Sequence, residues 1–158
     1  MTSNKRRKGR QLKKHAQDDF ADLKSKACRV IANDTVFIHT PNNEAKMSDM
    51  LAELVAPYLS SASTPDRYRG LLRLGIVAWN TALLPNSEQQ NMVDFFIRTS
   101  TVPAPERRIE DMKVLVSKLI ARKNSLFSEY KRAILSFDLK DTDNGYQLFV
   151  ASSEEEIR

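Results

Sequence analysis

The sequence predicts a mainly α-helical fold, a five-helix bundle-like domain with a C-terminal β-hairpin. Apolar residues recur at three- and four-residue steps in five stretches, which is the period of a buried helix face. Near the C-terminus the period changes to two, as in strands. The turn-forming pair Asn144-Gly145 separates two such alternating runs. The class becomes α+β if the hairpin pairs with residues 35–39.

The length of 158 residues suits one domain with extensions. Residues 1–11 hold almost nothing that could be buried, so we expect a basic, disordered tail there. Residues 12–152 are expected to form a single helical domain that includes the hairpin. Residues 153–158 contain three consecutive glutamates and should form an acidic, solvated tail.

The first helix is expected over residues 10–32, where apolar side chains line one face. Residues 35–39 are short and rich in β-branched residues, a composition typical of a strand. The second helix is expected to begin at Ser48, a favourable N-cap. Pro57 should end or kink it, because proline lacks the backbone donor that continues a helix.

The third helix has the clearest start, since Thr64 is an N-cap and Pro65 suits the first helical position. It should run to Leu84 and lie centrally, because it is apolar on nearly every side from Leu71 onward. Gly75 should allow another element to approach closely. Asn80 has two interpretations: a hydrogen-bonded core amide, which we favour, or a group lining a pocket.

The fourth and fifth helices follow from a capping box and a long periodic face. Ser87 with Gln90 matches the capping box. The fifth helix should span residues 105–130, with a seven-residue pattern that Lys123 interrupts. We favour packing of this helix within the domain over a self-associating coiled coil.

The first 14 residues carry a charge of +7 with no acidic residue, whereas the remaining 144 carry −2. The basic side chains of this segment, called the arm below, are Lys5, Arg6, Arg7, Lys8, Arg10, Lys13 and Lys14. Such a cluster can neutralise several phosphates, so it predicts contact with DNA or RNA. The arm holds no aromatic residue that could stack on a base. A solubilising extension and a nuclear import signal are the alternatives.

Arg69 and Arg73 lie four residues apart on the third predicted helix and therefore share a face. They could extend the phosphate-binding surface of the arm. The interpretation that we favour is structural: both side chains cover apolar neighbours and keep their charged ends in water.

The chemistry-bearing residues argue against an enzyme. There is one cysteine, Cys28, and two histidines, His15 and His39, with no flanking motif for a catalytic dyad. Phosphate-binding glycine loops are absent. The aspartates near Gly145 fail the calcium-loop spacing and suit a turn. We therefore expect neither a cofactor nor a metal.

These observations predict a non-catalytic, nucleic-acid-associated accessory or regulatory protein that uses the arm for phosphate contacts. The alternative is a protein–protein interaction subunit or adaptor whose arm only solubilises or targets it. No apolar run is long enough to cross a bilayer, so no membrane association is expected. A cytoplasmic location is expected, or a nuclear one in a eukaryotic host.

Overall fold

The computed structural model describes residues 46–100, 105–143 and 145–153. The predicted first helix, the predicted strand at residues 35–39, and the arm lie outside these ranges. The chain divides into two units. The described part of the helical unit is residues 46–100 and 105–134 with 152 and 153. The described part of the hairpin unit is residues 135–143 and 145–151.

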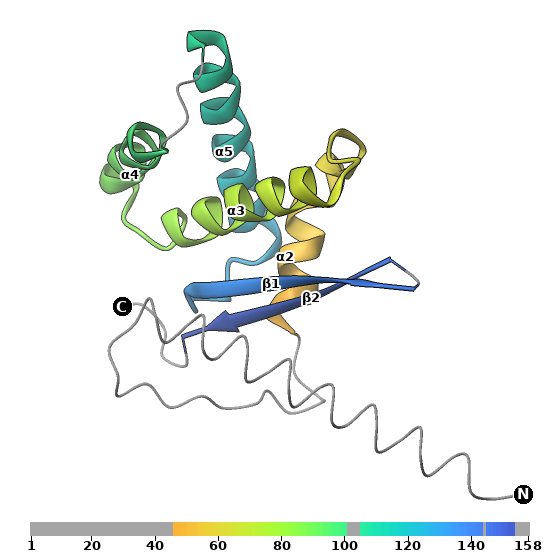
Figure 1. Ribbon diagram of the computed structural model, residues 1–158. Helices are drawn as coiled ribbons and strands as arrows, with labels where there is room; N and C mark the ends of the chain where they lie inside the picture. Colours follow the sequence, from red (N-terminus) through yellow and green to blue (C-terminus); the bar gives the residue numbers. More distant parts are fainter. Residues whose placement is uncertain (1–45, 101–104, 144, 154–158) are drawn as a thin grey trace, which may run out of the picture. The chain divides into compact units, whose positions relative to one another are not determined.

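The helical unit contains four α-helices within its described residues, where the sequence predicted five in the whole chain. They are α2 (Met47–Val55), α3 (Pro65–Thr81), α4 (Asn86–Thr99) and α5 (Glu106–Leu126), with a 3₁₀ helix, η1 (Ala56–Ser61), after α2. Figure 1 shows α3 lying across α5, with α4 beside α5. The fold is thus mostly helical, as predicted.

Of the three predicted N-cap residues, Ser48, Thr64 and Ser87, one is confirmed. The Thr64 hydroxyl accepts a 3.3 Å hydrogen bond from the Arg67 amide, and Pro65 is the first residue of α3. The predicted start at Ser48 is wrong, because α2 already includes Met47, a buried side chain. Burial of Met47 outweighs the local preference of serine for the cap.

The predicted capping box at Ser87 is also wrong, since Ser87 lies inside α4 after the cap residue Pro85. The fixed φ of proline, here −54°, prepares the chain to turn into a helix at Asn86. Proline also affects α2: the regular helix ends at Val55, and Pro57 lies in the 3₁₀ turn that follows. That ending was predicted.

The core of the helical unit is built on α3, as its sequence predicted. Trp79, Leu72 and Ala78 of α3 are fully buried, as are Leu51, Leu54 and Val55 of α2 and Val116 and Leu119 of α5. The helix ends at Thr81 rather than Leu84, and backbone bonds from Leu83 and Leu84 close a turn before Pro85.

Gly75 lets α2 approach α3 closely. A Cβ atom at this position would lie 2.8 Å from Val55 Cγ1 and 3.1 Å from Leu51 Cδ1, both on α2. These distances are shorter than ordinary contacts, so the prediction of a close approach at Gly75 is confirmed.

Helix α5 packs within the helical unit against α3, α4 and α2. It ends at Leu126, four residues before the predicted end at Tyr130. The Phe127 amide donates a 2.8 Å hydrogen bond to the Lys123 carbonyl, and the backbone then leaves the helical conformation at Phe127, with φ −133°.

The predicted C-terminal hairpin is present. Strands β1 (Ile134–Thr142) and β2 (Gly145–Ser152) form a two-stranded sheet within the described residues. Gly145 has a φ of 124°, a conformation that favours glycine. Pairing with residues 35–39 involves a segment outside the described ranges.

Candidate functional site

Of the predicted nucleic-acid contacts, the structure describes only Arg69 and Arg73. The other seven lie outside the described residues: Lys5, Arg6, Arg7, Lys8, Arg10, Lys13 and Lys14. Arg69 and Arg73 occupy α3 four residues apart, so they share one face of the helix.

The two arginines are not equivalent. Arg69 is half-buried and lies 3.4 Å from Asp66, one turn earlier on α3, whereas the Arg73 side chain is exposed. The Asp66 side chain is 96% exposed, so this ion pair is open to solvent and contributes little stability. Arg73 is thus the better placed of the two for an external anion.

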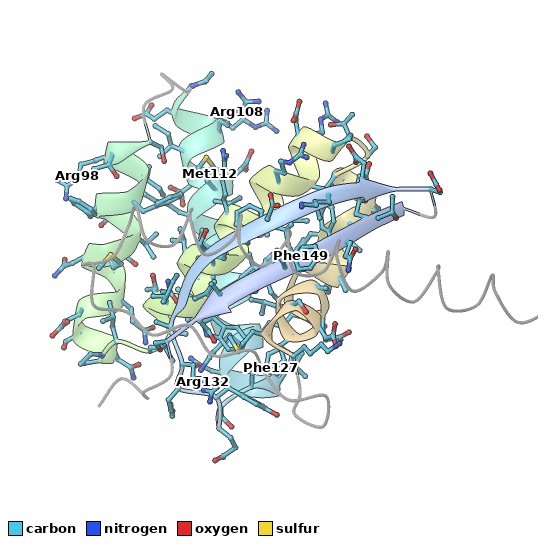
Figure 2. All side chains as sticks on the ribbon, turned by 60° about the horizontal axis from the view of Figure 1, so that its bottom comes forward. Arg98, Arg108, Met112, Phe127, Arg132 and Phe149 are labelled. Atoms are coloured by element: carbon cyan, nitrogen blue, oxygen red, sulfur yellow. The ribbon has the colours of Figure 1, made fainter. Side chains whose placement is uncertain are left out.

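A second group of cations and aromatic rings lies where α5 ends. We call it the α5-end cluster and define it as Trp79, Lys123, Phe127, Tyr130, Lys131 and Arg132. Figure 2 labels Phe127 and Arg132 in this segment, at the end of α5 remote from Arg108. The cluster belongs entirely to the helical unit.

Three aromatic rings of the cluster form a series from the core to the surface. Trp79 is 0% exposed, and its ring centroid lies 5.5 Å from that of Phe127. Phe127 is half-buried and meets Tyr130 edge-on, with 6.3 Å between ring centroids. Tyr130 is 38% exposed. Both spacings lie in the range favourable for aromatic pairs.

The segment that carries these rings is held by α3. The Trp79 indole N–H donates to the Arg132 carbonyl at 2.9 Å. Asn80 donates to the Ile134 carbonyl and accepts from the Ile134 amide, both at 2.8 Å. The favoured interpretation of Asn80 as a hydrogen-bonded amide is therefore confirmed. These bonds fix the C-terminal end of the Tyr130–Arg132 segment, and the start of β1 that follows it, to a buried helix.

Lys123 is an unusual member of the cluster because its side chain is only 1% exposed. Its ammonium lies 5.3 Å from the centre of the Trp79 ring, a cation–π distance. Among the described residues no carboxylate forms an ion pair with it. Burial lowers the pKa of Lys123 below its ordinary value, and the nearby charge of Lys131 lowers it further.

Arg122, the neighbour of Lys123, has a structural role. Its guanidinium donates to the carbonyls of Leu54 and Glu53 at 3.2 Å each, and to the Glu53 carboxylate at 3.0 Å. These contacts satisfy carbonyls at the C-terminal end of α2. Arg122 is thus committed to joining α5 to α2.

Helices α4 and α5 are joined by a different ion pair. Lys113 Nζ lies 2.9 Å from Asp94 Oδ1, and this contact raises the pKa of Lys113 and lowers that of Asp94. Asp94 Oδ1 is shielded from water, and the positive charge of Lys113 compensates its negative charge. Like Arg122, Lys113 is committed to holding two helices together.

A shallow groove of about 460 Å³ runs along α5 beside Gln90 of α4. Its α5 lining is Glu110, Lys113, Val114, Ser117, Lys118 and Ala121. Cations, an acid and small side chains alternate along it, so no single ligand chemistry follows from the groove.

The structure identifies no metal centre in the described ranges: no three His, Cys, Asp or Glu side chains there lie close enough to hold an ion. Cys28, His15 and His39, for which the sequence showed no catalytic motif, fall outside those ranges. None of the described helices is both long and apolar enough to cross a membrane.

Sequence reasoning missed the α5-end cluster. The local signal was the run Tyr130-Lys131-Arg132, an aromatic residue followed by two cations. The predicted fifth helix included Tyr130, so the run was not recognised as one segment. Lys123 interrupts the seven-residue pattern of the fifth predicted helix and Trp79 lies in the apolar third helix, but nothing local indicates that residues so distant in the chain lie in contact.

Comparison of this chain with models of protein families, with curated proteins and with solved structures finds no match. Its function is therefore argued from its own residues.

Proposed function

We propose that this chain is a non-catalytic accessory or regulatory protein that binds nucleic acid through its basic arm. The observation that carries the proposal is the separation of charge, +7 on the first 14 residues against −2 on the other 144. The basic character of the whole chain therefore comes from the arm alone.

The physical basis is the release of counterions from phosphates. Each lysine or arginine that neutralises a phosphate releases condensed ions, which drives binding without sequence preference. The exposed Arg73 extends this chemistry onto α3, with the paired Arg69 as its neighbour. The arm positions the chain on a backbone and distinguishes no bases. We place this activity in the cytoplasm, or in the nucleus of a eukaryotic host.

A second candidate, a protein-interaction subunit, is favoured by the surface of α4. Phe95 is 58% exposed, and Met92, one turn earlier, is also exposed. Large apolar side chains on a helix surface can anchor a partner protein. In this case the arm is only a solubilising or targeting extension.

Deleting residues 2–10 separates the two candidates. The deletion removes five of the seven cations of the arm. The nucleic-acid proposal expects the full chain to shift random-sequence DNA and RNA in gels, and the deleted chain to lose most of that binding. Equal binding by both chains would contradict it. Co-purification with protein that survives nuclease treatment, without affinity for nucleic acid, would favour the adaptor.

A further inference from the structure

We propose that the α5-end cluster binds a single strand of nucleic acid, with an unpaired base stacked on Tyr130 and backbone phosphates on Lys131 and Arg132. This inference rests on the proposed function and adds to it that the nucleic acid is single-stranded. The arm supplies charge alone, whereas the cluster joins charge to an aromatic surface.

The first argument is the support beneath Tyr130. Its ring is exposed, yet it rests on Phe127, which in turn rests on the buried Trp79. The Tyr130 amide donates to the Phe127 carbonyl at 3.1 Å, and the bonds from Trp79 to Arg132 and from Asn80 to Ile134 hold the backbone that follows Lys131. A ring held in this way loses little conformational freedom when a base stacks on it.

The second argument is positive charge in the cluster that forms no ion pair with a carboxylate in the part of the chain that the structure describes. Lys123 is buried over Trp79 with no carboxylate ion pair among the described residues, and Lys131 is exposed next to Tyr130. The acid nearest in sequence is Glu129, which is itself exposed. The ammonium of Lys131 is close enough to Lys123 to disfavour its charged form. A phosphate near Lys131 would relieve this repulsion.

The third argument selects the strand form. The face of a base is available for stacking on a side chain only when the base is unpaired and unstacked from its neighbours. Aromatic residues flanked by cations are the recurring platform for single strands. A duplex would present only phosphates to Lys131 and Arg132, and Tyr130 would add nothing to its binding.

The test uses the full chain and three labelled probes: oligo(dT), oligo(rU) and a random-sequence duplex. Tyr130→Ala should weaken binding of the single strands by roughly 5- to 150-fold, the loss expected for removing one stacked base. It should leave duplex affinity unchanged. Tyr130→Phe keeps the ring and should bind the single strands like the parent chain.

Phe95→Ala is the matched control, because Phe95 is exposed but has Asp94 and Phe96 as chain neighbours. It should leave affinity for all three probes unchanged. Trp79 is the only tryptophan, so its emission shows whether each variant keeps the fold around the cluster.

The outcomes separate this inference from the proposed function. If the parent chain binds none of the probes, both are wrong. If it binds and deletion of residues 2–10 weakens binding, but Tyr130→Ala leaves single-strand affinity unchanged, the arm acts alone and the inference is overturned. An equal loss with Tyr130→Ala and Phe95→Ala would also overturn it, because the loss would then not depend on the cations beside Tyr130.

Discussion

At the scale of single residues, Lys123 is a buried cation that lowers the stability of the fold and lies in the α5-end cluster. An ammonium removed from water is destabilised, and the 5.3 Å contact with the Trp79 ring returns only part of that energy, about 0.5–2 kcal/mol for a cation–π contact. A core position that retains such a group accepts lower stability than an apolar residue would give.

The lowered pKa of Lys123 has a definite consequence for stability. The folded chain holds the proton of this amine less tightly than the unfolded chain, so stability rises as pH increases from the folded pKa toward the unfolded value of 10.5. Lys123→Met keeps the length of the side chain and removes the charge. It should raise the free energy of unfolding at pH 7 by ~1 kcal/mol.

Urea unfolding of the parent and variant at pH 7 and near pH 10 measures this effect. The gain should shrink at the higher pH, because the lysine is then closer to neutral in both states. Lys118→Met, at an exposed position of α5, should change stability by less than about 0.5 kcal/mol at either pH. Marked destabilisation by Lys123→Met would show that its charge is compensated.

Asn80 is the residue that connects α3 to the start of β1. Its side chain satisfies both backbone groups of Ile134, a buried residue. Asn80→Ala leaves a donor and an acceptor without partners, at about 1–3 kcal/mol for each that stays buried. We expect a total loss of about 2–4 kcal/mol in urea unfolding. Asn124→Ala, exposed on α5, is the control and should be neutral or slightly stabilising. A near-neutral Asn80→Ala would mean that water replaces the amide.

At the scale of elements, the contact between α2 and α3 depends on a missing side chain. Gly75 and Gly70 both lie in α3, but only Gly75 faces another helix within contact distance. In an open helix position alanine is preferred to glycine by about 1 kcal/mol. Replacing each glycine with alanine therefore separates the effect of helix preference, at Gly70, from the effect of packing against α2, at Gly75.

Gly70→Ala should raise stability by about 0.5–1 kcal/mol, because a Cβ there meets nothing within 4 Å. Gly75→Ala should lower it by ~1 kcal/mol, since crowding Val55 and Leu51 outweighs the helix preference. Thermal melting of both variants checks the prediction. If Gly75→Ala stabilised as much as Gly70→Ala, α2 could move away from α3 at no cost.

The elements also show which features were predictable from sequence. Thr64 with Pro65, the role of Gly75, and the turn at Gly145 follow from local rules, and the structure agrees with each. The predicted starts at Ser48 and Ser87 failed because burial of Met47, one residue before Ser48, and the fixed φ of Pro85, two residues before Ser87, start each helix earlier. Burial of Met47, a tertiary contact, and the fixed φ of Pro85, a local effect, each override the cap preference of serine.

At the scale of the whole molecule, the periodicity of apolar residues predicted the mostly helical fold and the hairpin, but not the candidate site at the end of α5. The arm was readable because its charge is contiguous in sequence. The α5-end cluster was not, because Trp79, Lys123 and Tyr130 come together only through the packing of α3 on α5. The sequence predicted that the fifth helix continues to Tyr130, which would put this ring on a helix face. In the structure α5 ends at Leu126, and Tyr130 lies in the segment that follows.

The central claim is that the charge of the arm drives binding, and the dependence of affinity on salt measures it most directly. On a duplex the logarithm of the association constant falls with the logarithm of salt concentration by about 0.9 for each neutralised phosphate. If each of the five cations in residues 2–10 contacts one phosphate, deleting them should reduce that slope by about 4.5. The folded part should keep its melting temperature. An unchanged slope after the deletion would contradict the account.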